Sequence, residues 1–362
     1  MFRSMIPSMT RLQSITAAFS QKGIDGVLIA NSRNVRYFSG FTGSSGYLLI
    51  TRKVRLFITD FRYQEQAGRE IPPDFRVSIV NDDPQGFIVE KARSLGIQVL
   101  GFESTVSYGF YRSLLRKGVS LKALAGITED IRRIKDQHEL KLIRTAIDRA
   151  EKAFLEVRPS VRLGATERQI ALMLEEQLKK GGCRTLPFDI IVAAGKNSSM
   201  PHAKPTENRI KPGDLVVIDW GGEADGYYSD VTRTLLVKGG DMSKKMDIYM
   251  TVLAANNEAI RSISGGVQAK AVDKIARDVI KKAGYGEFFG HGTGHGVGLD
   301  VHELPRVSRV GRETIRPGMV FTIEPGIYVP GVGGVRIEDM VTATADGYAV
   351  MTSLSKAPDV IR

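Results

Sequence analysis

Short apolar runs alternate with short amphipathic segments over the first third of the chain, from Arg11 to about Leu121. Five runs have the length and composition of strands, and they read DGVLIA, GYLLIT, RLFITD, RVSIVN and IQVLGF. The segment RLQSITAAFSQKG before the first run has the spacing of an amphipathic helix. This alternation predicts a small α/β domain. The more charged segment ALAGITEDIRRIKDQHEL then predicts a connector, so we expect one domain over residues 1–130 and a second over 131–362.

From about Asp136 the hydrophobic positions take the spacing of longer helices, and the same order of elements occurs twice. Long helices are predicted at Gln137–Val157 and 243–264, and each is followed by a shorter helix that ends at glycine. The first of these shorter helices begins at a capping box formed by Thr166 and Gln169. Strands follow, FDIIVAAG and DLVVIDW in the first copy and MVFTIEPGIYV in the second. The fold class is therefore predicted as α/β (α+β), with a pseudo-twofold whose halves share one sheet covered by helices.

The strands of the first copy carry two carboxylates. Asp219 ends the apolar run LVVI, and the segment WGGEADGYYS leads from it to Asp230. A tight turn centred on 224–225 would place these two residues opposite each other on an antiparallel pair. Their Cβ atoms would then be roughly 5 Å apart.

The second copy repeats this arrangement with glutamates. Glu324 is followed by the glycine-rich turn VPGVGG, and the segment VRIED brings Glu338 back towards it. The pseudo-twofold would then direct four carboxylates to one point. A buried carboxylate is unfavourable by several kcal/mol unless it is neutralised, paired or bound to a cation.

Four of the five histidines lie in two short stretches. His202 is in MPHAKP, and His291, His295 and His302 are in GHGTGHGVGLDVHELP. The glycines around His295 allow the backbone to approach a neighbour closely, as a ligand loop requires. His138 lies on a charged helix and is assigned no role.

Four carboxylates and one imidazole form a mostly hard oxygen set, whose charge two divalent cations would neutralise. Such a set favours Mn²⁺, Co²⁺ or Fe²⁺ and accepts Zn²⁺. Two ions about 3.5–4 Å apart can bridge a water molecule and lower its pKa towards about 7, which would give a hydrolase its nucleophile. The alternative is a set of structural salt bridges, from Arg233 to Asp219 and Asp230, and from Arg336 to Glu338.

Composition and charge exclude several classes of partner. With 42% apolar and 25% charged residues the chain is typical of a globular protein, and its apolar runs are far shorter than the roughly 20 residues of a membrane span. The net charge of +11 comes from scattered basic pairs without a nucleic-acid-binding motif. We expect neither nucleic acid nor membrane as a partner. The single cysteine, Cys183, suits a reducing compartment and a buried packing role, so a cytoplasmic protein is predicted.

The chain resembles the pita-bread metallopeptidases, and among them the branch of Xaa-Pro aminopeptidases and prolidases (Xaa-Pro dipeptidases). The motifs that carry the resemblance are VIDWGGEADGYYSDVTRT, GHGTGHGVGLDVHELP, TIEPGIYVPGVGGVRIED and SSMPHAKP. The first 120 or so residues resemble the creatinase-type N-terminal domain through NVRYFSGFTGSSGYLL and FITDFRYQEQA. The resemblance implies a creatinase-like domain followed by a pita-bread catalytic domain. It also implies an exopeptidase that cleaves the Xaa-Pro bond at the N-terminus of proline-containing peptides with a hydroxide that bridges two metal ions.

The same resemblance implies a cofactor of two divalent ions, with Mn²⁺ or Co²⁺ expected first and Zn²⁺ or Fe²⁺ as alternatives. Asp230 and Glu338 would bridge both ions and Asp219 would hold one of them. His295 and Glu324 would hold the other, and Glu324 would also accept the proton of the bridging water.

Further residues match the substrate-binding positions of this branch. His202 and His302 match two histidines that contact substrate and stabilise the tetrahedral intermediate, and Arg336 matches an active-site arginine. Arg306 matches a position where some prolidases hold the C-terminal carboxylate of a dipeptide, with a surface arginine as the alternative. His291 is expected to be a packed core histidine.

The choice between Xaa-Pro aminopeptidase and prolidase stays open here, with a preference for the aminopeptidase because of the segment TDFRYQEQA and the compact length. Methionine aminopeptidase shares the metal set but usually lacks such an N-terminal domain, and creatinase shares the fold without the ligands. A non-catalytic pita-bread binding scaffold is the alternative of another class, and the intact ligand set disfavours it. The resemblance also implies a homodimer.

Overall fold

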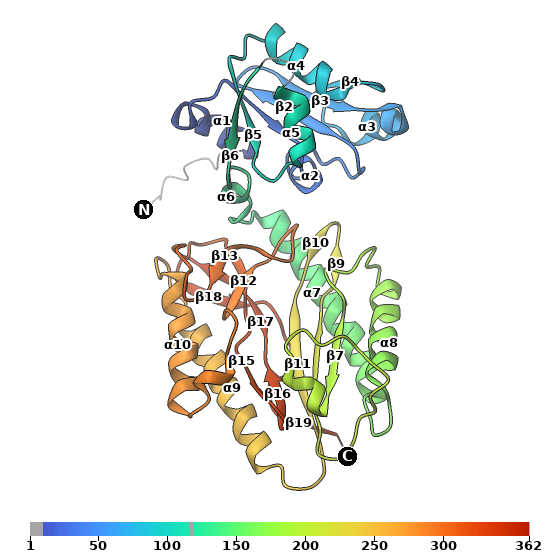
Figure 1. The fold of residues 1–362 in the computed structure, drawn as a ribbon, viewed down its shortest axis with the longest axis vertical. Coiled ribbons are helices and arrows are strands. Elements are labelled where there is room, and N and C mark those ends of the chain that lie inside the picture. The colour runs from blue at the N-terminus through green and yellow to red at the C-terminus, as the bar shows by residue number, and fades with distance from the viewer. Residues whose placement is uncertain (1–9, 116–118, 362) are drawn as a thin grey trace, which may run out of the picture. The chain divides into compact units, whose positions relative to one another are not determined.

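The computed structural model describes residues 10–115 and 119–361 of the chain. The chain divides into two compact units, one that ends at Arg132 and one that begins at Arg133. Figure 1 labels their elements in chain order. Among the residues described, no helix is both long enough and apolar enough to cross a membrane.

The first unit is built on a mixed sheet of six strands in the order β4-β3-β2-β1-β5-β6. The five predicted strands all form, and the edge strand β6 is an addition that was not predicted, because its residues SLKAL are mostly exposed and do not alternate. The strands are β1 (Gly26–Ile29), β2 (Tyr47–Thr51), β3 (Arg55–Thr59), β4 (Arg76–Ile79), β5 (Val99–Glu103) and β6 (Ser120–Leu124).

Over residues 10–115 and 119–132, six helices and one 3₁₀ turn accompany this sheet. The first begins at a capping box between Thr10 and Gln13 and ends at Gly23, whose positive φ of 59° a residue with a side chain rarely adopts. The elements are α1 (Arg11–Lys22), α2 (Ser32–Ser39), η1 (Phe61–Tyr63), α3 (Gln64–Glu70), α4 (Pro84–Ser94), α5 (Tyr108–Leu115) and α6 (Glu129–Arg132).

The second unit repeats the order helix, helix, strands, as predicted. The helices are α7 (Gln137–Val157), η2 (Arg158–Ser160), α8 (Glu167–Lys180), η3 (Gly195–Ser199), α9 (Ser243–Arg261), α10 (Ala269–Lys282) and η4 (Gly286–Phe288). The strands of the first half are β7 (Ile191–Ala194), β8 (Leu215–Trp220), β9 (Glu223–Ala224), β10 (Tyr227–Tyr228) and β11 (Val231–Val237). Those of the second half are β12 (Gly294–Gly296), β13 (Glu303–Val307), β14 (Val320–Ile323), β15 (Gly326–Val329), β16 (Gly333–Arg336), β17 (Asp339–Thr344), β18 (Gly347–Val350) and β19 (Asp359–Ile361).

The strands of the two halves do not form the single sheet that was predicted. They form a four-stranded sheet in the order β19-β11-β8-β7, a five-stranded sheet in the order β13-β12-β14-β17-β18, and the two-stranded pairs β9–β10 and β15–β16. Where the halves meet, the Thr234 hydroxyl donates to the Arg336 carbonyl (2.8 Å) and accepts from the Arg336 N–H (3.1 Å). Because this side chain occupies the place of ladder bonds, β11 and β16 do not pair regularly.

The second unit has two main apolar cores, one beside the green helices α7 and α8 and one beside the orange helices α9 and α10, which Figure 1 labels. In the first half, Phe154 of α7 stacks on Trp220 of β8 with ring centroids 4.6 Å apart. Cys183 is buried in the same core, as predicted. In the second half, α9 and α10 pack through residues such as Val252 and Val272 against Phe321 of β14. These two cores hold in place the strands that carry the candidate site residues.

Candidate metal centre and substrate cavity

The hairpin that carries Asp219 and Asp230 has a different register from the predicted one. Asp219 on β8 pairs with Thr232 on β11, and the turn lies at Asp225 and Gly226, one residue later than expected. Both turn residues have positive φ, 47° and 77°, which is the signature of a type I′ turn. Moving the turn by one residue shifts the pairing by two, so Asp230 is the diagonal neighbour of Asp219 on the same face.

The second hairpin places Glu324 opposite Glu338, in agreement with the predicted return of the chain. Ile323 pairs with Asp339 between β14 and β17, and Gly326 pairs with Arg336 between β15 and β16. The same register on both sides puts the two glutamates directly across from each other. The backbone N–H of Glu338 also donates to the Thr232 carbonyl at 3.1 Å, which ties this hairpin to the first.

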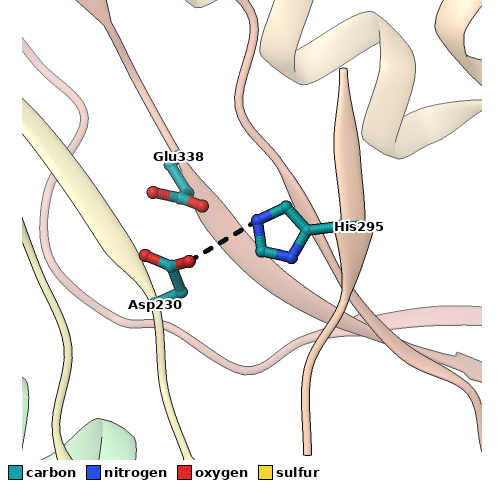
Figure 2. A group of neighbouring side chains, drawn as sticks. All are labelled: Asp230, His295 and Glu338. Atoms are coloured by element: carbon teal, nitrogen blue, oxygen red, sulfur yellow. Dashed lines mark ion pairs between the residues drawn. The ribbon is translucent and has the colours of Figure 1, made fainter. Parts of the chain in front are cut away.

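Three of the predicted ligands form one compact cluster, shown in Figure 2. One ligand atom from each of Asp230, His295 and Glu338 lies within 4.8 Å of the other two. His295 Nε2 is 3.6 Å from Asp230 Oδ2 and 3.3 Å from Glu324 Oε1. Two carboxylates and an imidazole from three separate segments therefore converge at one point, with Glu324 beside them.

The hydrogen bonds and charges of this cluster fit a divalent cation. Asp219 Oδ1 and Glu338 Oε1 are buried and have no hydrogen-bond partner among the described residues, so both oxygens are free to bind an ion. Burial, and after it the neighbouring carboxylates, raise the pKa of Asp230 and of Glu338 well above the usual value. For Glu324, burial is outweighed by the hydrogen bond and charge of His295, and the pKa is lowered to about 2. Cations placed among these groups would remove the repulsion that the pKa shifts report.

The alternative set of salt bridges is wrong in its pairings. Arg233 forms its ion pair with Asp339 (2.8 Å), and Arg336 forms its own with Asp219 Oδ2 (2.6 Å). In the part of the chain that the structure describes, no arginine forms an ion pair with Asp230 or Glu338. The Arg336 pair leaves the other oxygen of Asp219 unbonded, and burial still raises the pKa of Asp219.

The cluster opens into a cavity of about 510 Å³ that also contains the predicted substrate-binding residues. The His302 ring lies beside the His295 ring, with centroids 4.3 Å apart. Burial and, after it, the neighbouring His295 lower the pKa of His302, so its imidazole is neutral near pH 7. All predicted site residues line this one cavity, namely His202, Asp219, Asp230, His295, His302, Arg306, Glu324, Arg336 and Glu338.

His291 lies in the wall of the same cavity and is held by both ring nitrogens. Nδ1 lies 2.8 Å from the Gly292 carbonyl and Nε2 lies 3.0 Å from the Tyr328 hydroxyl. Its ring also meets the Phe289 ring edge-on, with centroids 5.1 Å apart. This packing agrees with the structural role expected for His291.

Sequence reasoning missed Tyr328, whose buried hydroxyl accepts from Arg336 Nη1 at 2.8 Å and contacts His291. Tyr328 therefore joins the histidine loop to the Arg336–Asp219 pair. A signal was present, because Tyr328 lies four residues after Glu324, and in extended backbone even spacing places side chains on one face.

A second residue that sequence reasoning missed is Glu167, which fixes the segment that carries His202. Glu167 begins α8, is fully buried, and accepts hydrogen bonds from a segment far away in the sequence. Its donors are the Ala194 N–H (2.8 Å), the Asn197 amide (2.9 Å), the Thr206 N–H (3.0 Å) and hydroxyl (2.6 Å), and the Asn208 amide (3.0 Å). One carboxylate thus holds both ends of the loop around His202.

Comparison with known proteins agrees with this fold. Residues 141–345 match the model of metallopeptidase family M24, and residues 11–134 match the creatinase/prolidase N-terminal domain. The chain belongs to metallopeptidase family M24 and is a hydrolase of the pita-bread fold with a creatinase-type N-terminal domain. Family membership implies divalent metal ions. The candidate site for them is the cluster of Asp230, His295 and Glu338, which we call the acid–histidine cluster.

Individual relatives define the branch of this family. The chain is 38% identical to an Xaa-Pro dipeptidase of Pyrococcus horikoshii over 358 residues, which cover 96% of this chain and 97% of the relative. An Xaa-Pro dipeptidase structure from Bacillus anthracis matches with a TM-score of 0.94 and 38% identity, over 97% of this chain and 99% of that one. An X-Pro aminopeptidase structure from Thermotoga maritima matches with a TM-score of 0.88 and 36% identity, over 98% and 100%. The chain therefore falls within the Xaa-Pro dipeptidase/aminopeptidase branch.

Proposed function

We propose that this protein is a metal-dependent Xaa-Pro dipeptidase that hydrolyses dipeptides with a C-terminal proline. The observation that carries the proposal is the shared cavity, in which the acid–histidine cluster is accompanied by His202, His302 and Arg306. The cluster supplies the metal-binding groups, the two histidines supply hydrogen-bonding groups, and Arg306 supplies a positive charge. The dipeptidase names of the relatives support the same choice.

The proposed cofactor is a pair of divalent ions, Mn²⁺ or Co²⁺ first and Zn²⁺ or Fe²⁺ as alternatives. We assign Asp230 and Glu338 to both ions, Asp219 to one, and His295 with Glu324 to the other. Bound ions of this kind polarise a carbonyl group and lower the pKa of a water molecule. Oxygen-rich sites with one histidine favour Mn²⁺ and Co²⁺ over metals that prefer sulfur ligands.

The remaining chemistry belongs to the side chains of the cavity. Glu324 is ionised, because its pKa is lowered to about 2, and can accept a proton from the attacking water. His302 is neutral near pH 7 and can donate a hydrogen bond to the oxygen that gains charge, a contact whose loss typically lowers the rate about 10²–10³-fold. The proline nitrogen of the substrate carries no proton, so on leaving it must receive one, from Glu324 or through His202.

A second candidate is the Xaa-Pro aminopeptidase that the sequence analysis preferred. It is supported by the likeness to the Thermotoga maritima aminopeptidase structure. The two activities differ in the substrate. In a dipeptide the proline itself carries the free C-terminal carboxylate, whereas in a longer peptide another residue follows the proline. Arg306 is an exposed cation in the same cavity as the cluster, and it provides a counter-charge for that carboxylate.

The function is tested with the purified protein and two matched substrates, an Ala-Pro dipeptide and an Ala-Pro-Ala tripeptide. We expect turnover that requires added Mn²⁺ or Co²⁺, that a chelator abolishes, and that favours the dipeptide in kcat/KM. Preference for the tripeptide would support the aminopeptidase instead. Absence of chelator-sensitive turnover on both substrates would contradict the enzyme assignment and favour a binding scaffold.

Arg306→Ala is expected to raise KM for the dipeptide about tenfold or more, because one hydrogen-bonded charge contact to the substrate carboxylate is lost. The tripeptide, whose carboxylate lies one residue further on, should be much less affected. Arg309→Ala is the matched control, since Arg309 is an exposed arginine three residues away that lines a different cavity. Equal losses on both substrates would contradict the proposed role of Arg306.

A further inference from the structure

Helix α10 carries a buried acid that lies outside the predicted ligand set. Asp273 is 1% exposed, and its carboxylate forms an ion pair with Arg277 one turn later, at 2.7 Å from Nε to Oδ2 and 3.0 Å from Nη2 to Oδ1. Oδ1 also accepts from the Thr293 hydroxyl at 2.8 Å and from the Thr293 N–H at 3.2 Å. The carboxylate therefore connects the helix to the glycine-rich segment that leads into β12.

Thr293 passes this connection to two of the proposed ligands. Its carbonyl accepts from the Glu324 N–H at 2.7 Å, while its own N–H and hydroxyl are bound to Asp273. Thr293 is fully buried and lies two residues before His295. Thr293 thus fixes the backbone of Glu324 and the backbone that leads into His295. The side chains of these two residues lie close together, with His295 Nε2 3.3 Å from Glu324 Oε1.

Arg277 holds the same segment at further points. Its guanidinium lies over the Phe289 ring, 4.2 Å from the centroid, and donates to the Phe289 carbonyl at 3.1 Å. It also donates to the His291 carbonyl. Asp273 and Arg277 together therefore hold residues 289–293 through both the backbone and side chains.

The segment needs such support because of its composition. In GHGTGHG, glycine occupies every second position, and glycine backbone loses more freedom on ordering than any other residue. Glycine is required at position 294, since a Cβ there would come within 1.9 Å of the Thr322 carbonyl oxygen. A segment that cannot be stiffened by its own side chains is instead held from α10, as the His202 segment is held by Glu167 from α8.

We propose that Asp273 is a positioning residue for the metal centre, which acts through Thr293 to hold His295 and Glu324 in place for one of the two ions. This inference rests on the proposed function, because it takes His295 and Glu324 as ligands. Groups that orient metal ligands without touching the ion typically account for 10- to 100-fold in metal affinity. Asp219, assigned to the other ion, is connected to this segment indirectly, through His291, Tyr328 and Arg336, so the effect should fall mainly on one ion.

The test is a titration of the metal-free full-length protein with Co²⁺, followed by visible absorption and by calorimetry. The unchanged protein is expected to bind two ions. Asp273→Asn keeps the size of the side chain but removes its charge, and it should weaken one binding event about 10- to 100-fold while changing the other much less. Thr293→Val, which keeps the Asp273–Arg277 pair, should weaken the same event, and Thr293→Ser should restore it.

Asp278→Asn is the matched control, because Asp278 is an exposed acid of the same helix that pairs with Lys274. It should leave both binding events unchanged. Identical Co²⁺ binding by Asp273→Asn and the unchanged protein would overturn the inference while leaving the proposed function intact. Weakening of both events to the same extent would also overturn it. Absence of Co²⁺ binding by the unchanged protein would overturn the proposed function and this inference with it.

Discussion

Asp230→Asn is expected to lower Xaa-Pro hydrolysis at least about 10³-fold and, at the same time, to raise the thermal stability of the metal-free protein. Loss of one stabilising donor alone typically lowers kcat about 10²–10³-fold, and Asp230 is assigned to both ions. The gain in stability has a separate cause. Burial, Glu338 and Asp219 raise the pKa of Asp230 well above its usual value, so its carboxylate is unfavourable in the folded protein when no cation is bound.

Stability is best followed through Trp220, the single tryptophan of the chain, which is buried in the second unit against Phe154. Its fluorescence reports the unfolding of the unit that contains the site. For a domain of this size each kcal/mol of stabilisation raises Tm by about 2–4 °C. We therefore expect an increase of a few degrees for metal-free Asp230→Asn at neutral pH. A lower Tm together with unchanged activity would contradict both the repulsion and the ligand assignment.

Asp339→Asn is the matched control, because it is a buried aspartate of the same region with opposite electrostatics. Asp339 accepts from Arg233 at 2.8 Å and from the Thr352 hydroxyl at 2.8 Å. Burial raises the pKa of Asp339, but the charges of Arg233 and Lys356 outweigh it, so this pKa is lowered overall. Breaking a buried ion pair typically costs about 3–5 kcal/mol, so this variant should lose stability where Asp230→Asn gains it.

The sequence predicted the elements of the fold better than their pairing. Helix α7 has the predicted bounds, and the capping box at Thr166 and Gln169 begins α8, because these signals are local. The turn lies at Asp225 and Gly226, one residue later than predicted, because a type I′ turn requires positive φ at both positions and the pair Asp-Gly adopts it readily. The predicted single sheet does not form, because at Thr234 a side-chain hydrogen bond takes the place of backbone pairing between the two halves. The hydrophobic periodicity of the sequence does not reveal such a side-chain contact.

The site was predictable as a set of residue types but not as a network. The duplicated strands that each end in an acid predict residues that line one cavity in the structure. The partners that hold them could not be predicted, because they are distant in sequence. Asp273 meets Thr293 across 20 positions, and Arg336 meets Asp219 across 117. Single-sequence patterns carry no information about contacts of this range.

Saturating Mn²⁺ is expected to raise the Tm of the protein relative to the chelator-treated form, and the difference should grow as the pH rises from about 5 to 8. An ion present at 100 times its dissociation constant stabilises the folded state by about 2.7 kcal/mol, which corresponds to roughly 5–10 °C. The pH dependence follows from the raised pKa values of Asp230 and Glu338. Carboxyl groups whose pKa is raised by folding stabilise the metal-free protein while they are protonated, and this stabilisation is lost as the pH rises through their folded pKa values.

The metal-bound form has the opposite dependence, because the ligands must be deprotonated to bind an ion, and protons therefore compete with it at low pH. The two Tm curves should diverge with increasing pH, as measured by Trp220 fluorescence in Mn²⁺ and in chelator. Asp230→Asn should bring the curves together, since it removes both a ligand and one of the titrating groups. A difference that stayed constant with pH would show that metal binding does not compete with protonation of these carboxylates. A difference that grew on acidification would contradict the raised pKa values themselves.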